Sequence, residues 1–426
     1  MFDELTGVDP MAGEAALVER IAELERLKSA AAAGQARATV ALDTARRAAE
    51  SAAGVPAAKR GRGLASEVAL ARRDSPTRGG RHLGLARALV DEMPHTLAAL
   101  EAGALSEWRA TLIVRESACL AVEDRRTLDA EMCSNTGELD GLGDARITAR
   151  AKEIAYRLDP KAVVDRAVRA QNERAVSIRP APDSMAYVTA LLPMPQGVAV
   201  YAVLRREADR SCDGRGRGQV MADTLVERIT GRPADVPVPV TLDLVLTDES
   251  LFANSTVPAR VAGYGPIPAA VARNLVSDAV EDRRSRATLR RLYRHPRSGA
   301  LVAMESRARL FPKALAKFIS LRDETCRTPY CDAPIRHIDH AVPHRHGGPT
   351  SGRNGLGECE RCNYAKEAPG WIVAALCDDV GGHVAEFTTP TGARHFSKAP
   401  PLPGLVIADF SEAEVRIGIE IAKHVA

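Results

Sequence analysis

The chain has 426 residues, of which 45% are hydrophobic and only 4% aromatic, and its formal net charge at pH 7 is +3. This length predicts two or three domains, and the shortage of aromatic side chains favours helical cores built from Ala, Val, Leu and Ile. The first ten residues, MFDELTGVDP, are acidic and lack the positive and apolar regions of a secretory signal. We therefore do not expect export, and we expect a cytoplasmic protein.

A long helix is predicted from Glu14 to Glu50. Apolar residues recur at helical spacing in its first half, and an alanine-rich continuation without proline follows. Because its other face is charged, this helix either packs against the rest of the chain or pairs with another copy. A homo-oligomer formed through the N-terminal helices is therefore one interpretation. The next segment, Ser51–Gly63, is predicted to be a mobile basic loop.

More helices are predicted up to about Ala170. Gly103 is expected to end one of them, and Ser106 to begin the next by accepting a hydrogen bond from a free amide of its first turn. The uncharged run Met185–Leu204 is as long as a membrane span, but PMPQG interrupts it. We predict a strand, a turn and the start of a helix there, and no membrane partner.

Short β-branched runs at residues 186–194 and Val236–Thr247 predict a small sheet. A helix within residues 219–231, ending at Gly231, is predicted between these runs, and another within residues 264–280. Residues 295–303 predict a turn and a short strand, and an amphipathic helix then leads to the cysteines. After Trp371 we expect one strand, a loop and a final helix at Glu412–Ala426. The predicted fold class is α+β, with domains at residues 1–63, 64–311, 312–372 and 373–426.

Four of the eight cysteines form two close pairs, Cys326-x4-Cys331 and Cys359-x2-Cys362. In a cytoplasmic chain this pairing indicates metal binding rather than a disulfide framework. Two pairs of thiolates match a closed tetrahedral Zn²⁺ site, which leaves no open coordination position. We therefore expect a structural zinc that stabilises a module with little core of its own.

Reactive chemistry then has to come from the residues between the cysteine pairs. Asp339 offers a hard oxygen ligand for Mg²⁺ or Mn²⁺, and the His340 imidazole is suited to taking a proton from water. Neighbouring residues of a strand point to opposite faces, so these two act together only where the chain kinks or the strand ends. The glycines of HGGPT are expected to fold the chain back, and Asn354 could orient the imidazole.

The order Cys-x4-Cys, Asp-His, Gly-Gly-Pro-Thr, Asn, Cys-x2-Cys-Asn, Lys resembles the HNH nuclease family, whose catalytic unit is the ββα-metal fold. The resemblance implies that His340 is the general base and that Asp339 binds the catalytic metal. It implies that Asn354 holds the loop and the base. It also implies that Asn363, where the family's name-giving pattern has His, is the second protein ligand, and that Lys366 faces a phosphate.

A second resemblance, to a helical domain of unknown function that precedes HNH modules in many actinobacterial proteins and is also called the 13E12-repeat family, covers Ala15 to Phe311. It implies architecture rather than mechanism. It rests on the order of five short motifs: PHTLAALEAGALSEW, RLDPKAVVDRA, QVMADTLVERITG, GYGPIPAAVAR and RHPRSGALVA.

Twelve Lys and Arg residues and a single acid, Glu305, lie between Arg283 and Arg322. This stretch is either a solvated helix face or a surface that follows the DNA backbone with salt-sensitive affinity. Arg345 and Arg353 are candidates for clamping phosphate oxygens. The remaining histidines of the cysteine-rich region are interpreted as loop residues or partners of the backbone: His337, His344 and His346.

Together these patterns predict a DNA endonuclease that uses Mg²⁺ or Mn²⁺ for hydrolysis and Zn²⁺ for structure. One alternative is a non-catalytic, zinc-stabilised DNA-binding protein. The other is an assembly protein whose N-terminal helices make the contacts and whose nuclease module is a passenger.

Overall fold

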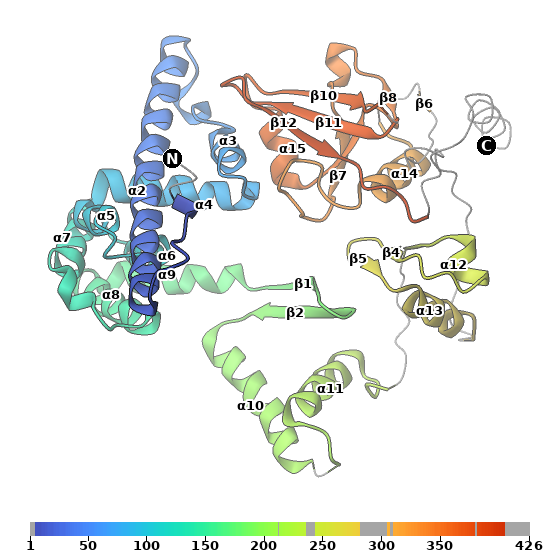
Figure 1. Cartoon of the computed structure of the whole chain (residues 1–426), viewed down its shortest axis with the longest axis horizontal. Helices are drawn as coiled ribbons and strands as arrows, with labels where there is room; N and C mark the ends of the chain where they lie inside the picture. The colour runs from blue at the N-terminus through green and yellow to red at the C-terminus, as the bar shows by residue number, and fades with distance from the viewer. Residues whose placement is uncertain are drawn as a thin grey trace. The chain divides into compact units, whose positions relative to one another are not determined.

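The computed structural model describes residues 5–211, 213–235, 243–281, 305–306, 310–379 and 381–404. Helices and small antiparallel sheets share the chain, which confirms the predicted α+β class (Figure 1). Its contacts define two compact units. The first comprises Met1–Arg169, Pro329–Cys331 and Tyr364–Trp371, and the second comprises Ala170–Thr328, Asp332–Asn363 and Ile372–Ala426. The predicted boundaries after residues 63, 311 and 372 stay predictions.

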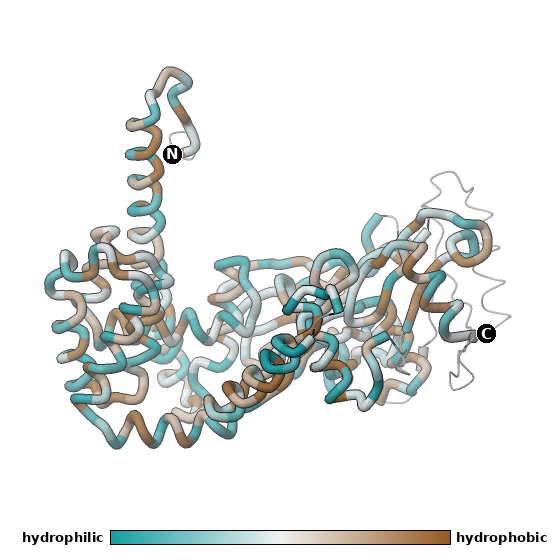
Figure 2. The backbone as a smooth tube through the Cα atoms, turned by 90° about the horizontal axis from the view of Figure 1, so that it is seen from below, coloured by the Kyte–Doolittle hydropathy of each residue, from teal (hydrophilic) through white to brown (hydrophobic). Residues whose placement is uncertain are grey.

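The predicted long helix is confirmed as α2 (Glu14–Ala52), and part of it packs against the rest of the chain, which is one of the two expected alternatives. Leu17, Val18, Ile21 and Leu27 are exposed, as the 67% exposure of Ile21 shows, whereas Ala33 and Ala36 further along the helix are buried. Hydrophobic and hydrophilic residues alternate along the helix (Figure 2). Small alanine side chains let α2 approach Leu89, Leu97 and their neighbours closely, so the alanine-rich half makes the core contact.

The predicted series of helices up to residue 170 is also confirmed. Gly103 adopts φ +75°, a conformation that favours glycine, and the Ser106 hydroxyl accepts a hydrogen bond from the Arg109 amide at 3.3 Å. Both local predictions therefore hold. The helices are α3 (Leu64–Ala71), α4 (Pro76–Arg87), α5 (Pro94–Glu101), α6 (Glu107–Ser117), α7 (Val122–Cys133), α8 (Asp144–Leu158) and α9 (Pro160–Ala170), with short η1 (Ala57–Lys59), η2 (Ala88–Glu92) and η3 (Thr136–Leu139).

The next part of the chain contains two separate small sheets where one was predicted. A hairpin of β1 and β2 forms the first, and β3, β4 and β5 form the second. The elements are η4 (Gln171–Glu173), β1 (Ala175–Ala181), β2 (Met185–Leu191), α10 (Met194–Arg210), α11 (Arg217–Thr230), β3 (Leu244–Val245), α12 (Asp248–Phe252), β4 (Ala259–Val261), β5 (Gly265–Ile267) and α13 (Ala269–Glu281). Residues 236–242 of the second predicted strand run lie outside the described residues.

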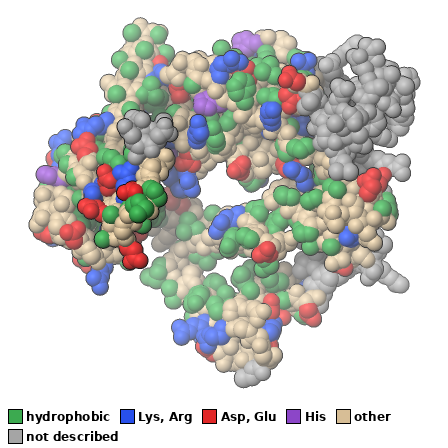
Figure 3. All heavy atoms as spheres, viewed as in Figure 1, with side chains coloured by type: hydrophobic (Ala, Val, Ile, Leu, Met, Phe, Trp, Pro, Cys, Tyr) green, Lys and Arg blue, Asp and Glu red, His purple; other side chains and the backbone are tan. Residues whose placement is uncertain are grey.

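The β1–β2 hairpin and α10 leave many apolar side chains exposed. Ile178 is 72% exposed, Leu191 58% and Tyr201 60%. Figure 3 shows hydrophobic side chains over these elements. The strand, turn and helix predicted for residues 185–204 are present as β2 and α10. Among the described helices none is both long and apolar enough to cross a membrane.

The C-terminal part contains two strands directly followed by a helix, and then a three-stranded sheet where a single strand was predicted. Strands β7 and β9 pair antiparallel, and β10, β11 and β12 form the sheet. The predicted turn and strand at 295–303 and the final helix at 412–426 lie outside the described residues. The elements are β6 (Glu305–Ser306), α14 (Lys313–Asp323), β7 (His337–His340), η5 (His344–His346), β8 (Thr350–Ser351), β9 (Gly355–Glu358), α15 (Glu360–Lys366), β10 (Ile372–Cys377), β11 (His383–Thr388) and β12 (Arg394–Lys398).

A small apolar core joins the strand pair to the three-stranded sheet. Leu356 of β9 packs with Val373, Ala385 and Phe387, and Phe387 is only 1% exposed. All four residues of β9 are buried, and Leu356 lies on the face of the strand that meets this core. This core fixes β9, the strand that ends at the second cysteine pair.

A buried carboxylate at the end of α14 holds the same strand by hydrogen bonds. Asp323 is 1% exposed and accepts hydrogen bonds from Arg322 Nε at 2.6 Å, Arg327 Nη1 at 3.0 Å and the Gly357 amide at 2.7 Å. Arg322 Nη2 also donates to the Gly355 carbonyl at 2.7 Å, and Arg327 Nη2 to the Ser397 carbonyl at 2.5 Å. Helix α14, β9 and β12 are thus connected through three charged side chains.

His383, at the start of β11, is buried next to this network. Its Nε2 lies 2.8 Å from the Arg353 carbonyl, and its Nδ1 is buried without a hydrogen-bond partner among the described residues. Burial, with the positive charge of Arg322 as a second cause, lowers the pKa of His383 to about 4. The protonated ring would add a buried donor without an acceptor, so the folded state keeps the ring neutral.

Replacing Asp323 by Ala is expected to lower the free energy of unfolding of this region by about 3–5 kcal/mol, because two buried guanidinium groups lose their counter-charge. Tryptophan fluorescence during urea unfolding measures this in a Trp108→Phe background, where Trp371 is the only tryptophan. The exposed Asp332, changed to Ala, is the matched control. Equal midpoints for the two variants would contradict the role of Asp323.

Acid is expected to destabilise the same region through His383. Its folded-state pKa of about 4 lies below the ordinary value of 6.5, so the unfolded chain binds more protons in this interval. Stability is therefore complete above pH 6.5 and falls as the pH drops towards 4, by about 3 kcal/mol in total. Urea midpoints at pH 4 to 7 should fall more steeply for the Trp108→Phe protein than for the same protein carrying His383→Gln. If the urea midpoints of the two proteins changed with pH in parallel, the loss of stability in acid would not be due to His383.

Candidate metal centre

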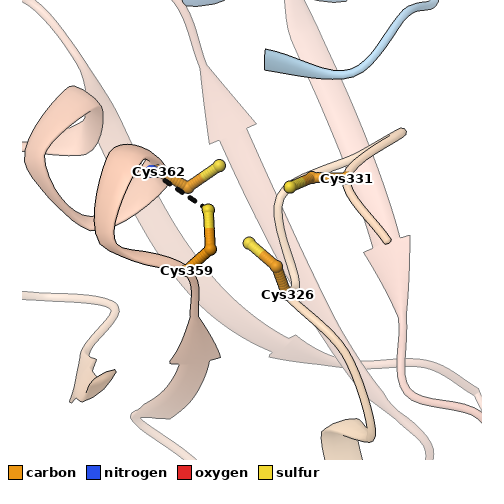
Figure 4. A group of neighbouring side chains, drawn as sticks. All are labelled: Cys326, Cys331, Cys359 and Cys362. Carbon is orange, nitrogen blue, oxygen red and sulfur yellow. Dashed lines mark hydrogen bonds between the residues drawn. The ribbon is translucent and has the colours of Figure 1, made fainter. Parts of the chain in front are cut away.

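The two predicted cysteine pairs meet in space. Cys326 and Cys331 come from the loop after α14, Cys359 directly follows β9, and Cys362 lies on α15. Their four Sγ atoms lie within 4.8 Å of one another, and all four residues are buried. The side chains point toward a common centre, and the Cys362 amide lies 3.5 Å from Cys359 Sγ (Figure 4).

This donor set fits a metal such as zinc. Zinc–sulfur bonds of about 2.3 Å in a tetrahedron place the sulfur atoms roughly 3.8 Å apart, which lies within the observed limit. None of the four cysteines forms a disulfide. Their soft thiolate ligands select Zn²⁺ over Mg²⁺ or Ca²⁺, and four of them would leave no open position for a substrate. The cluster can therefore hold a structural ion.

Asp339 and His340 lie at the end of β7, which is the strand-end arrangement under which neighbouring residues can act together. Asp339 Oδ1 accepts a hydrogen bond from the His340 amide at 2.9 Å and lies 3.6 Å from His340 Nδ1. The imidazole is buried, whereas the Asp339 side chain keeps 34% exposure. The carboxylate thus lies beside the ring and remains within reach of solvent.

Asn363, on α15, lies on the other side of the Asp339 carboxylate. One terminal atom of its amide is 2.7 Å from Asp339 Oδ2, and as nitrogen this atom would donate to that oxygen. The two residues predicted to bind a catalytic metal are therefore neighbours. A further carboxylate, Glu358 at the end of β9, lies 3.1 Å from the same amide atom.

Sequence reasoning missed Thr350, which contacts the ring of His340. Thr350 Oγ1 lies 2.9 Å from His340 Nε2, and both side chains are buried. Phe311 packs on the same imidazole with its ring centroid 4.6 Å away. Thr350 belongs to the GGPT sequence, which could have drawn attention to it. Its contact with His340, ten residues earlier, depends on the path of the loop between them, and the sequence does not reveal that path.

Asn354 contacts the loop between β7 and β8 rather than the imidazole. Its Oδ1 accepts from the Val342 amide at 3.0 Å, and its Nδ2 donates to the carbonyls of Val342 and Pro349 at 3.0 and 2.9 Å. Asn354 thus holds the loop, as the resemblance implies, and reaches the ring only indirectly, because this loop carries Thr350. Gly348 is required here, since a Cβ would lie 1.8 Å from the Val342 carbonyl oxygen.

The residues predicted to contact DNA differ in exposure. Arg345 and Arg353 are exposed, whereas the Lys366 side chain is only 3% exposed and lies 3.4 Å from Glu367. His344 and His346 are exposed on η5, and His337 is half-buried on β7. A phosphate contact by Lys366 stays a prediction.

Most of the basic stretch from Arg283 to Arg322 lies outside the described residues. Within the described part, Lys317 pairs with Asp243, and Arg322 is buried against Asp323. Arg322 therefore serves the fold and is no part of a basic surface.

Comparison of the sequence with models of known protein families identifies a family for most of the chain. The family model described as "Domain of unknown function (DUF222)" matches residues 21–323, and the chain therefore belongs to this family. This match supports the domain of unknown function expected between Ala15 and Phe311, and it ends just before Cys326. No curated protein and no solved structure matches the chain.

Cys362→Ser is expected to lower the bound zinc from one equivalent per chain to a small fraction, because the site loses one of four thiolates. Zinc binding contributes on the order of 10 kcal/mol to the folding of such sites, so the fluorescence transition of Trp371 in the Trp108→Phe background should shift strongly. The exposed Cys377, changed to Ser, is the control. Metal analysis by mass spectrometry measures the zinc, and a full equivalent in Cys362→Ser would contradict the assignment.

Proposed function

We propose that this DUF222 protein is a metal-dependent DNA endonuclease that hydrolyses phosphodiester bonds, with a structural zinc at its four cysteines. One observation carries the proposal: the Asp339 carboxylate lies between an imidazole and a side-chain amide, 3.6 Å from His340 Nδ1 and 2.7 Å from Asn363. A strand pair followed directly by a helix presents these groups, an arrangement in keeping with the ββα-metal unit. It combines a base with hard ligands for a cation.

In this proposal His340 is the general base. If Nε2 carries the proton and donates to Thr350 Oγ1, then Nδ1 keeps a lone pair on the side of Asp339. This lone pair takes a proton from the attacking water. Thr350 holds the tautomer and the ring orientation, and Asn354 holds the loop on which Thr350 lies.

The donor set beside His340 fits a hard divalent cation, since carboxylate and amide oxygens are ligands that Mg²⁺ and Mn²⁺ accept. Asp339 and Asn363 would hold such an ion. When bound, it would stabilise the charge that develops on the phosphate and on the leaving oxygen. The exposed Arg345 and Arg353 would bind backbone phosphates, which fixes the position of DNA but carries no sequence information.

The alternative is a zinc-stabilised protein that binds DNA without cleaving it. It needs the cysteine cluster and the exposed arginines but assigns no task to the contact between Thr350 and His340. The same plasmid experiment distinguishes the two functions.

Zinc-loaded protein is expected to nick supercoiled plasmid DNA when Mg²⁺ or Mn²⁺ is added and to be inactive without added metal. His340→Ala should lower the rate roughly 10²- to 10⁴-fold, the usual contribution of a general base. His346→Ala is the matched control, because this histidine is exposed on the neighbouring turn. Agarose gels give the rates, and filter binding at several salt concentrations gives DNA affinity.

The outcomes separate the functions. Cleavage that requires both the metal and His340 would support the nuclease. Equal rates for His340→Ala and wild type would refute the assigned base. No cleavage, together with salt-sensitive DNA binding, would favour the non-catalytic alternative.

A further inference from the structure

We infer that Glu358 supplies a third protein oxygen to the divalent cation of the proposed nuclease site, beside Asp339 and Asn363. This inference rests on the proposed function. Neither the spacing of the cysteines nor the match to the DUF222 family assigns a task to Glu358. It follows from strand register, from the position of one amide and from burial.

Strand register places Glu358 and Asp339 on one face. In the antiparallel pair of β7 and β9, His337 lies opposite Glu358, and Asp339 lies opposite Leu356. Opposite residues point to the same face, and every second residue along a strand returns to it. The side chains of Asp339 and Glu358 are therefore diagonal neighbours, close enough for their carboxylates to reach a common point.

The Asn363 amide lies between these two carboxylates. One terminal atom is 2.7 Å from Asp339 Oδ2 and 3.1 Å from Glu358 Oε2. As nitrogen, this atom donates a hydrogen bond to both oxygens. A half-turn of the amide group exchanges its two terminal atoms, and three oxygens then converge on one point. The amide can thus serve the site without a cation in one orientation and bind a cation in the other.

The spacing of these atoms matches a small cation. Oxygens bound at 2.0–2.1 Å at right angles to each other, as around Mg²⁺, lie roughly 3 Å apart. The separations of 2.7 and 3.1 Å agree with this value. Ca²⁺, with bonds of about 2.3–2.6 Å, would need wider spacing, above roughly 3.2 Å. The geometry therefore favours Mg²⁺ or Mn²⁺ over Ca²⁺.

Burial separates Glu358 from an ordinary surface glutamate. Its side chain is completely buried, although glutamate is rarely so unless its charge is compensated. A bound cation is a strong local source of positive charge and would stabilise the ionised form. Asp339 remains partly exposed, so a cation held by both carboxylates would keep one side open to water and a phosphate.

Mn²⁺ binding to the full-length, zinc-loaded protein tests this inference. Free Mn²⁺ is measured by electron paramagnetic resonance during titration of wild type, Glu358→Gln and Asp339→Asn. Glu360→Gln is the matched control, because this glutamate is exposed on α15 two residues further along. We expect Glu358→Gln and Asp339→Asn each to weaken Mn²⁺ binding at least about tenfold, a typical loss when a metal site is disturbed, and Glu360→Gln to bind as wild type does.

The two proposals fail in different ways. If Asp339→Asn binds Mn²⁺ more weakly while Glu358→Gln binds it as wild type does, the role of Glu358 is overturned and the proposed catalytic site stays intact. Wild type that binds no Mn²⁺, or an unchanged Asp339→Asn variant, would overturn the catalytic site and the role of Glu358 with it.

Zinc content and thermal unfolding show whether Glu358→Gln is folded. If it is not, Glu358→Asp replaces it, since this change keeps the charge and withdraws the carboxylate by one methylene group. Glu358→Asp should also bind Mn²⁺ at least about tenfold more weakly. Unchanged affinity in this folded variant would overturn the inference.

Discussion

The buried carboxylate of Asp323 is the constraint on which the candidate site depends. It neutralises the guanidinium groups of Arg322 and Arg327 and accepts a hydrogen bond from the Gly357 amide. These contacts fix β9 relative to α14, and the register of β9 then determines which residue lies opposite Asp339 on β7. A slip of one residue would turn Leu356 away from its core and Glu358 away from Asp339, because side chains alternate along a strand. The network thus determines the chemistry of the site without taking part in it.

Local chemistry explains what the sequence could predict. The cysteine pairs, Ser106 as a helix cap and the glycines of the loop each act through their own chemical type at short range, so their spacing was informative. Thr350 and Glu358 were missed because their contacts depend on the register and path of strands that are distant in sequence. Arg322 was assigned to a basic surface although its partner, Asp323, is the next residue, because the sequence does not reveal that both side chains are buried at the end of α14.

Tertiary contacts also explain what the sequence could not predict of the fold. The prediction left open which part of α2 packs, and the alanine-rich part is the one with buried residues, because close approach of helices favours small side chains. The tail contains three strands where one was predicted, since short runs such as Arg394–Lys398 pair with β11 and need little apolar pattern of their own.

The proposed structural and catalytic metals would both be bound by the short segment from Glu358 to Asn363, and two pairs of adjacent residues explain how this is possible. Glu358 precedes Cys359, and Asn363 follows Cys362. Consecutive residues diverge in direction, so the segment can present sulfur to one centre and oxygen to another. Soft thiolates favour Zn²⁺ and hard oxygens favour Mg²⁺ or Mn²⁺, which keeps each ion at its own centre. Because the cysteines hold the start of α15, the ion they bind would also fix the position of Asn363. Loss of zinc would therefore disturb the oxygen site even where no oxygen ligand is altered.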